Sequence, residues 1–166
     1  MPRLIKLHGR DLSWAEDVFT DVTDEDAIPE GPVILSLARF QAEGDALIGA
    51  NRPVGVRIEA TEAIEDLAYD LPRIAVVALV FPKFRDGRHY SAARLLRERY
   101  NYSGEIRAVG DVLREQAHFM LRCGFDAFIP ADGSTPEEWA GVGSRYRHVY
   151  QRATDDRIPA FEERRG

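Results

Sequence analysis

The sequence predicts an α/β protein in which repeated strand–helix units surround a parallel sheet. Short apolar runs alternate with amphipathic stretches between residues 31 and 133, and the connections between them are short. Residues 74–81 (IAVVALVF) are apolar at every position, which is typical of a central parallel strand. The pattern leaves open whether the sheet is open and doubly wound or curved like a half barrel. In both architectures, binding residues gather beyond the carboxyl ends of the strands.

The 166 residues are enough for one domain with its own core. We divide residues 1–166 into a polar lead-in (1–30), a βα core (31–133), and a C-terminal helix with a polar tail (134–166). The expected strands are residues 4–7, 33–37, 54–58, 74–81, 105–109 and 125–129. The expected helices are residues 39–49, 62–71, 91–102, 111–124, and 135 to about 150.

Residues that favour helix ends mark several of these boundaries. Ser91 and Asp111 are expected to cap the helices that follow them, and Gly104 lies just beyond the end of the first of these. Residues 135–138 (TPEE) combine a cap, a proline at the first helical position and two acids in the first turn. In residues 62–71, apolar side chains recur at i, i+3, i+4 and i+7.

Composition excludes several classes of protein. No apolar run approaches the roughly 20 residues of a membrane helix, and the start of the chain lacks the apolar core of a secretory signal. We therefore expect a cytoplasmic protein without a membrane partner. One cysteine and four scattered histidines provide no cluster or zinc motif, so no metal and no cofactor is expected. An acidic chain also argues against a nucleic-acid partner.

Charge is distributed unevenly along the chain. The net charge is −6, yet residues 82–122 hold nine basic and five acidic side chains, which predicts two surfaces of opposite sign. The loop at 82–88 follows the most apolar strand and enters a helix start, where backbone N–H groups and cations bind oxyanions such as sulfite, sulfate or phosphate. The expected oxyanion-binding residues are Lys83, Arg85, Asp86, Arg88, Ser91, Arg107 and Gln116.

Some polar residues in this region occupy positions where the period calls for apolar side chains. Arg57 and Arg107 lie within predicted strands, and Arg99 lies on the apolar side of its predicted helix. A buried guanidinium needs a carboxylate or a bound anion to offset its desolvation. The alternatives stay open: the arginines bind a ligand, they pair within the protein with Glu59, Glu105 or Asp111, or their side chains extend to water.

The other polar residues have simpler interpretations. Gln116 falls in the buried arc of its predicted helix and is expected to bond a neighbouring backbone group. Arg94 and Arg97 are expected on the surface, with Arg94 paired to Glu98 one turn away.

Four blocks of the sequence are familiar: FPKFRDG (81–87), YSAARLLRERY (90–100), GEIRAVGDVL (104–113) and RCGFDAF (122–128). They resemble domain of unknown function family 934, a bacterial family, and the resemblance is densest from about residue 54 to residue 128. Members of that family are often labelled as oxidoreductases involved in sulfite reduction. The resemblance therefore implies a role in sulfur metabolism, specifically in sulfate assimilation, with sulfite reductase or the sulfonucleotide reductase as partner.

Three functions follow from these observations. The first is an accessory protein of assimilatory sulfate or sulfite reduction that binds a small oxyanion or the reductase machinery. The alternative is an enzyme that acts on a small anionic substrate at the 82–88 and 110–111 loops, with Asp111 or His89 as general base. An oxidoreductase comes third, because it would need a borrowed cofactor. Whether the protein is an enzyme, and whether it forms a homo-oligomer, stay open.

Overall fold

The computed structural model describes residues 3–83 and 86–143. Its strands are β1 (Leu4–His8), β2 (Asp11–Ala15), β3 (Thr20–Asp21), β4 (Val33–Ser36), β5 (Val54–Ile58), β6 (Val76–Phe81), β7 (Glu105–Gly110) and β8 (Ala127–Phe128). Its helices are α1 (Leu37–Gly49), α2 (Arg88–Glu98), α3 (Ala117–Cys123) and α4 (Pro136–Gly143). The eight strands form one sheet in the order β2-β1-β8-β7-β6-β5-β4-β3.

Strand order decides between the two architectures that the sequence left open. From β3 to β8 every strand lies beside its neighbour in the chain, and all five of these pairings are parallel. A doubly wound sheet needs a reversal of strand order, and this sheet has none in its parallel part. Because crossovers share one hand, connections that always step in the same direction place their helices on the same face.

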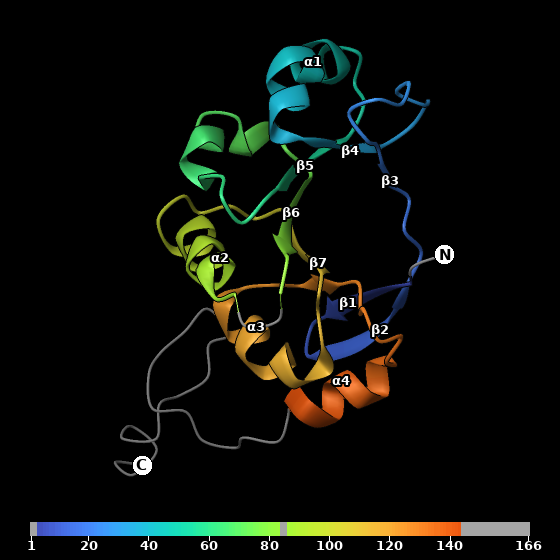
Figure 1. Ribbon diagram of the computed structural model, residues 1–166, viewed down its shortest axis with the longest axis vertical. Coiled ribbons are helices and arrows are strands. Elements are labelled where there is room, and N and C mark those ends of the chain that lie inside the picture. The colour runs from blue at the N-terminus through green and yellow to red at the C-terminus, as the bar shows by residue number, and fades with distance from the viewer. Residues whose placement is uncertain (1–2, 84–85, 144–166) are drawn as a thin grey trace.

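The sheet is curled into a half barrel. A flat sheet of this many strands would separate its edge strands by about 34 Å. Here the edge strands β2 and β3 are joined by residues 16–19 alone, which span at most about 18 Å when fully extended. Figure 1 shows this joining segment on the side of the sheet opposite α1 and α2. The joining segment therefore runs over the concave face of the half barrel.

Side chains on alternate strand positions build two cores. Val77 and Leu79 of β6 face the helices and belong to the main core, which extends over the whole sheet. Val76 and Ala78 point to the opposite, inner face, where they form a smaller buried cluster. Phe19 of the joining segment packs against that inner cluster. The apolar run predicted as a central strand is thus buried on both faces.

Most predicted strands are confirmed. Residues 33–37, 54–58, 74–81 and 105–109 correspond to β4, β5, β6 and β7, and residues 4–7 correspond to β1. The strand expected at 125–129 is shorter. Residues 3–30, expected to be a polar lead-in, contribute three strands to the sheet. The alternating exposure of β2 explains why its sequence is polar, since one face of this edge strand meets solvent.

The prediction of an α-helix at residues 62–71 is wrong. Strand β5 is therefore not followed by an α-helix, and the predicted repeat of strand–helix units is interrupted here. Two 3₁₀ turns, Ile64–Leu67 and Leu71–Arg73, occupy this connection. They still bury Ile64, Leu67 and Leu71. Spacing of i, i+3 fits the 3₁₀ geometry as well as the α-helix, and Pro72 lacks the N–H that an α-helix would use.

Two predicted helix caps are also wrong. Helix α2 begins at Arg88 with Gly87 as its N-cap, three residues before Ser91, because the Asp86 carboxylate accepts the Arg88 backbone N–H at 3.1 Å. The stretch expected to become helical at Asp111 turns only at residues 114–116, and α3 follows. The start of α4 at Pro136 is confirmed. Its expected extension to about residue 150, the polar tail and Arg85 lie outside the described residues.

Candidate functional site

The carboxyl ends of β6 and β7 meet closely at one edge of the sheet. Gly110 ends β7 with a φ of +90°, and a Cβ atom there would lie 2.5 Å from the carbonyl oxygen of Phe81. The next residue, Asp111, donates its backbone N–H to that same oxygen at 2.7 Å. Only glycine fits this contact and this backbone conformation. The loops that start at Pro82 and at Gly110 are therefore neighbours, as the parallel sheet requires.

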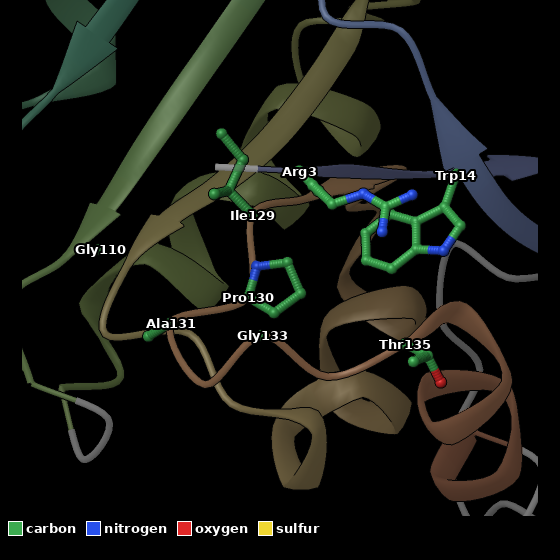
Figure 2. A pocket seen from close by; sticks show the side chains of 8 residues that line it. All are labelled: Arg3, Trp14, Gly110, Ile129, Pro130, Ala131, Gly133 and Thr135. Atoms are coloured by element: carbon green, nitrogen blue, oxygen red, sulfur yellow. The ribbon is translucent and has the colours of Figure 1, made fainter. Parts of the chain in front are cut away.

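A cavity of about 560 Å³ opens beside this edge. It lies between the β1–β2 hairpin, the end of β7, the chain after β8 and the start of α4 (Figure 2). The eight described lining residues include one cation and no carboxylate: Arg3, Trp14, Gly110, Ile129, Pro130, Ala131, Gly133 and Thr135. The cavity is therefore mainly apolar, with a single positive charge.

Arg3 and Trp14 form one wall of the cavity. The hairpin register pairs Leu4 with Ala15, which makes Arg3 and Trp14 diagonal neighbours on one face of the two strands. The guanidinium carbon of Arg3 lies 4.0 Å from the centroid of the Trp14 ring, and Figure 2 shows the Arg3 side chain extended between Ile129 and Trp14. In the described part of the chain no carboxylate forms an ion pair with Arg3.

The opposite wall is a loop held by its own hydrogen bonds. The Ala131 N–H donates to the Val112 carbonyl at 2.8 Å. The Asp132 carboxylate accepts from the Ser134 backbone N–H at 3.0 Å and from its hydroxyl at 2.6 Å. Although burial tends to raise the pKa of Asp132, these two bonds lower it overall. In turn, the Ser134 hydroxyl accepts from the indole N–H of the buried Trp139 at 2.7 Å.

Thr135 completes this wall at the start of α4. Its backbone N–H donates to the Glu138 carboxylate at 2.7 Å, and its hydroxyl oxygen accepts the Glu138 N–H at 3.3 Å. This reciprocal arrangement is a capping box, as expected from the TPEE sequence. Because Glu138 already satisfies the helix start, we assign no anion to the N-terminus of α4.

The sequence profile of one protein family matches most of the chain. The family is described as "Bacterial protein of unknown function (DUF934)", and the match covers residues 55–161. The chain belongs to this family. No curated protein matches the chain. The DUF934 match includes Gly110 and the loop at 129–135, whereas Arg3 and Trp14 precede it. The cavity thus combines DUF934 residues with the N-terminal hairpin.

The basic loop within the DUF934 motif FPKFRDG is partly neutralised. Lys83 is exposed. Asp86 and Arg88 pair with each other through several contacts, the shortest of 2.5 Å, and the Arg88 side chain is 58% exposed. Hydrogen bonds from Arg88 hold the pKa of Asp86 at about 2. Ser91 is exposed on α2 and makes no cap. Lys83 follows Phe81, the residue paired with Gly110, by two positions.

His89, a candidate general base, lies inside the protein. It is 3% exposed, stands edge-on to Phe81 with ring centroids 5.8 Å apart, and has Nε2 3.2 Å from the Glu59 carbonyl oxygen. Burial lowers its pKa, although the carbonyl groups of Glu59 and Val80 oppose this. His89 does not line the cavity. Asp111, the other candidate, is half-buried and directly follows the cavity residue Gly110.

Arg107 and Arg57 are ion-paired within the protein, which is one of the alternatives drawn from the sequence. Arg107 is 2% exposed and bonds Glu105 at 2.7 Å and Asp17 at 2.8 and 3.1 Å. Arg57 pairs with Asp21 and lies 3.5 Å from Glu59. Burial raises the pKa of Asp21, while Arg57 opposes this. Arg107 therefore holds the joining segment onto the concave face through Asp17, while Arg57 links β5 to Asp21 of β3.

Strand register explains how the concave face accommodates these large cations. The row of paired residues across the sheet alternates cations with alanines: Arg57, Ala78, Arg107, Ala127 and Lys6. Each alanine leaves room for the side chain beside it. Lys6 then contacts Glu105 at 2.7 Å. We infer that this row stabilises the fold.

Gln116 is bonded within the protein, as predicted. Its Oε1 accepts the Leu113 backbone N–H at 3.0 Å, and its side chain bonds the Tyr90 hydroxyl. Arg94 lies 3.6 Å from Glu98 on the exposed face of α2, also as predicted. In the described chain no group of three or more His, Cys, Asp or Glu side chains is arranged to hold a metal, and no helix there is long and apolar enough to cross a membrane.

Sequence reasoning missed Arg3 and Trp14, which carry the cavity's charge and its aromatic wall. A usable signal existed. Residues 4–8 and 11–15 flank Gly9, and a hairpin about that turn fixes Arg3 and Trp14 as diagonal neighbours. The polar sequence of β2 instead predicts an irregular lead-in, so the strand that positions Trp14 escapes the local pattern.

Proposed function

We propose that this protein binds a small oxyanion in the cavity beside the carboxyl ends of β7 and β8. The observation that carries the proposal is the Arg3 guanidinium, which enters a cavity whose described lining residues include no carboxylate. An anion there would meet a positive charge that no carboxylate of residues 3–83 and 86–143 compensates. Arg3 differs in this respect from Arg57, Arg88 and Arg107, whose charges are paired with carboxylates.

We place this activity in assimilatory sulfate or sulfite reduction, with the protein as an accessory component. The support is the resemblance to family members labelled for sulfite reduction, together with a cavity suited to an anion. The partner would be sulfite reductase or the sulfonucleotide reductase. Co-purification of either reductase with the tagged chain tests the partnership. Recovery equal to that with an unrelated acidic protein of similar size would argue against it.

An enzymatic role is the second candidate, and the position of Asp111 favours it. Asp111 directly follows the cavity residue Gly110, where the loops after β6 and β7 meet. Its side chain is not among the described lining residues, so as a general base it would act from the rim of the cavity on a bound anionic substrate. Turnover of a small anionic substrate should be lost in Asp111→Asn while the anion still binds. Retained turnover in that variant would remove Asp111 from the mechanism.

Thermal stability measured against sulfite, sulfate and phosphate tests the binding proposal. An anion present at 100 times its dissociation constant should stabilise the fold by ~2.7 kcal/mol. Arg3→Gln should abolish the stabilisation, whereas Arg94→Gln, a matched change at an exposed arginine on α2, should retain it. Equal stabilisation of both variants would show that the anion binds elsewhere.

A further inference from the structure

The size of the cavity provides information about the ligand beyond its charge. A volume of about 560 Å³ falls within the range of roughly 300–1,000 Å³ typical of clefts and cavities that bind small organic molecules. A bare sulfite or phosphate ion would occupy only the part next to Arg3. The remainder of the cavity leaves room for a group of different chemistry.

The Arg3–Trp14 stack indicates which part of that occupant is charged. Stacking uses the flat face of the guanidinium, while its N–H donors lie in the plane and point away from the ring. Those donors remain able to form paired hydrogen bonds with two oxygens of a carboxylate, sulfonate, sulfate or phosphate group. Since Trp14 fixes the plane of Arg3, this fork is oriented before the ligand arrives.

The rest of the lining is suited to an apolar body. Ile129, Pro130 and Ala131 form a continuous stretch of wall without charged side chains (Figure 2). Gly133 has no side chain, and a Cβ placed there would meet nothing within 4 Å, so this side of the cavity is open. An inorganic ion, which is strongly hydrated, gains nothing from such a wall. An organic group gains in proportion to the apolar area that it buries.

We infer that the cavity takes an organic oxyanion, in which one carboxylate, sulfonate, sulfate-ester or phosphate-ester group is attached to an apolar body. The inference rests on the proposed function, because it assigns the oxyanion to Arg3. It adds that Trp14, Ile129 and Pro130 select ligands by their organic part. The anionic group binds Arg3, and the apolar body lies against the loop at 129–131.

Calorimetric titration with phosphate, phenyl phosphate and benzenesulfonate tests this inference on the full chain. Both aromatic anions should bind at least about tenfold more tightly than phosphate. Arg3→Gln should weaken all three by about tenfold or more, as expected for a lost charged hydrogen bond. Ile129→Ala should weaken only the aromatic anions, severalfold. Phe119→Ala, which truncates an exposed aromatic residue on α3, is the matched control and should change nothing.

The outcomes distinguish the claim of an organic ligand from the claim of an oxyanion site at Arg3. Equal affinity for phosphate and the aromatic anions, with loss in Arg3→Gln, would overturn the organic ligand and leave the oxyanion site standing. No binding of any of the three would overturn both. Tighter aromatic binding that persists in Arg3→Gln would also overturn the inference, because the charge would then play no part. If Ile129→Ala fails to fold by circular dichroism, Ile129→Val provides the same comparison with a smaller expected loss.

Discussion

Arg97 and Arg99 lie two positions apart, yet their roles are the reverse of those predicted. Arg97, expected on the surface, donates to the carbonyls of Gly124, Tyr102 and Gly104 at 3.0, 2.8 and 2.7 Å. Arg99, expected on the apolar side, is exposed. The helical wheel failed here because α2 ends at Glu98, so that the chain turns back and presents its carbonyls to Arg97.

At the scale of single residues, Gly110→Ala should be strongly destabilising. The new Cβ would meet the Phe81 carbonyl oxygen at 2.5 Å, and the φ of +90° is strained for alanine. We expect a loss of at least about 2 kcal/mol in the free energy of unfolding, measured by urea denaturation. Gly133→Ala is the matched control: its φ of +69° is also positive but its surroundings are empty, and we expect about 1 kcal/mol. Equal losses would show that the Phe81 contact is unimportant.

At the scale of elements, Asp126 connects the end of α2 to β7. It accepts the Ile106 backbone N–H at 2.8 Å and lies 3.3 Å from Arg97. Burial raises the pKa of Asp126 above its ordinary 3.8, even though Arg97 opposes this. The folded protein therefore keeps this proton to a higher pH than the unfolded chain does, and the stability it contributes is lost as the pH rises through the raised pKa.

Asp126→Asn tests this sign, since asparagine keeps the hydrogen-bond acceptor but does not titrate. The free energy of unfolding of the wild type relative to Asp126→Asn should fall as the pH rises above 3.8. Asp86→Asn should behave oppositely, because Arg88 holds the pKa of Asp86 at about 2; relative to that variant the wild type should gain stability between pH 2 and 3.8. Denaturation curves at a series of pH values check both predictions. If the stability of the wild type relative to Asp126→Asn rose with pH, the raised pKa of Asp126 would be contradicted.

At the scale of the whole molecule, the joining segment makes the curled sheet one structural unit. It connects the two edge strands, and Asp17 on it bonds Arg107 of β7. Arg107→Ala would remove the cation that bonds Asp17 and, within the described chain, would leave Glu105 with Lys6 alone on the concave face. We expect a loss of about 3–5 kcal/mol in the free energy of unfolding, against less than about 0.5 kcal/mol for the exposed Arg94→Ala. A small loss for Arg107→Ala would mean that the segment is held chiefly by Phe19.

The sequence predicted the parallel core well but not the site. Apolar runs such as 74–81 identified the central strands, because burial on both faces leaves a clear local pattern. The short strands β2 and β3 are edge strands with exposed positions, and their pairing depends on distant parts of the chain. The cavity needs Arg3 and Trp14 to meet the loop at 129–135, which no local pattern records. The sequence predicts that Arg57 and Arg107 need partners, and the structure supplies them from carboxylates on several different elements.

The central claim is that an oxyanion binds at Arg3 in the cavity beside β7 and β8. Its most direct test is the titration of isotope-labelled protein with phosphate, followed by the NMR shifts of backbone amides and of arginine Nε–H groups. We predict that the largest shifts occur at the Arg3 Nε–H and at the amides of Gly110, Ala131 and Gly133. Shifts confined to Lys83 and Arg88, or no saturable shift at all, would contradict the claim.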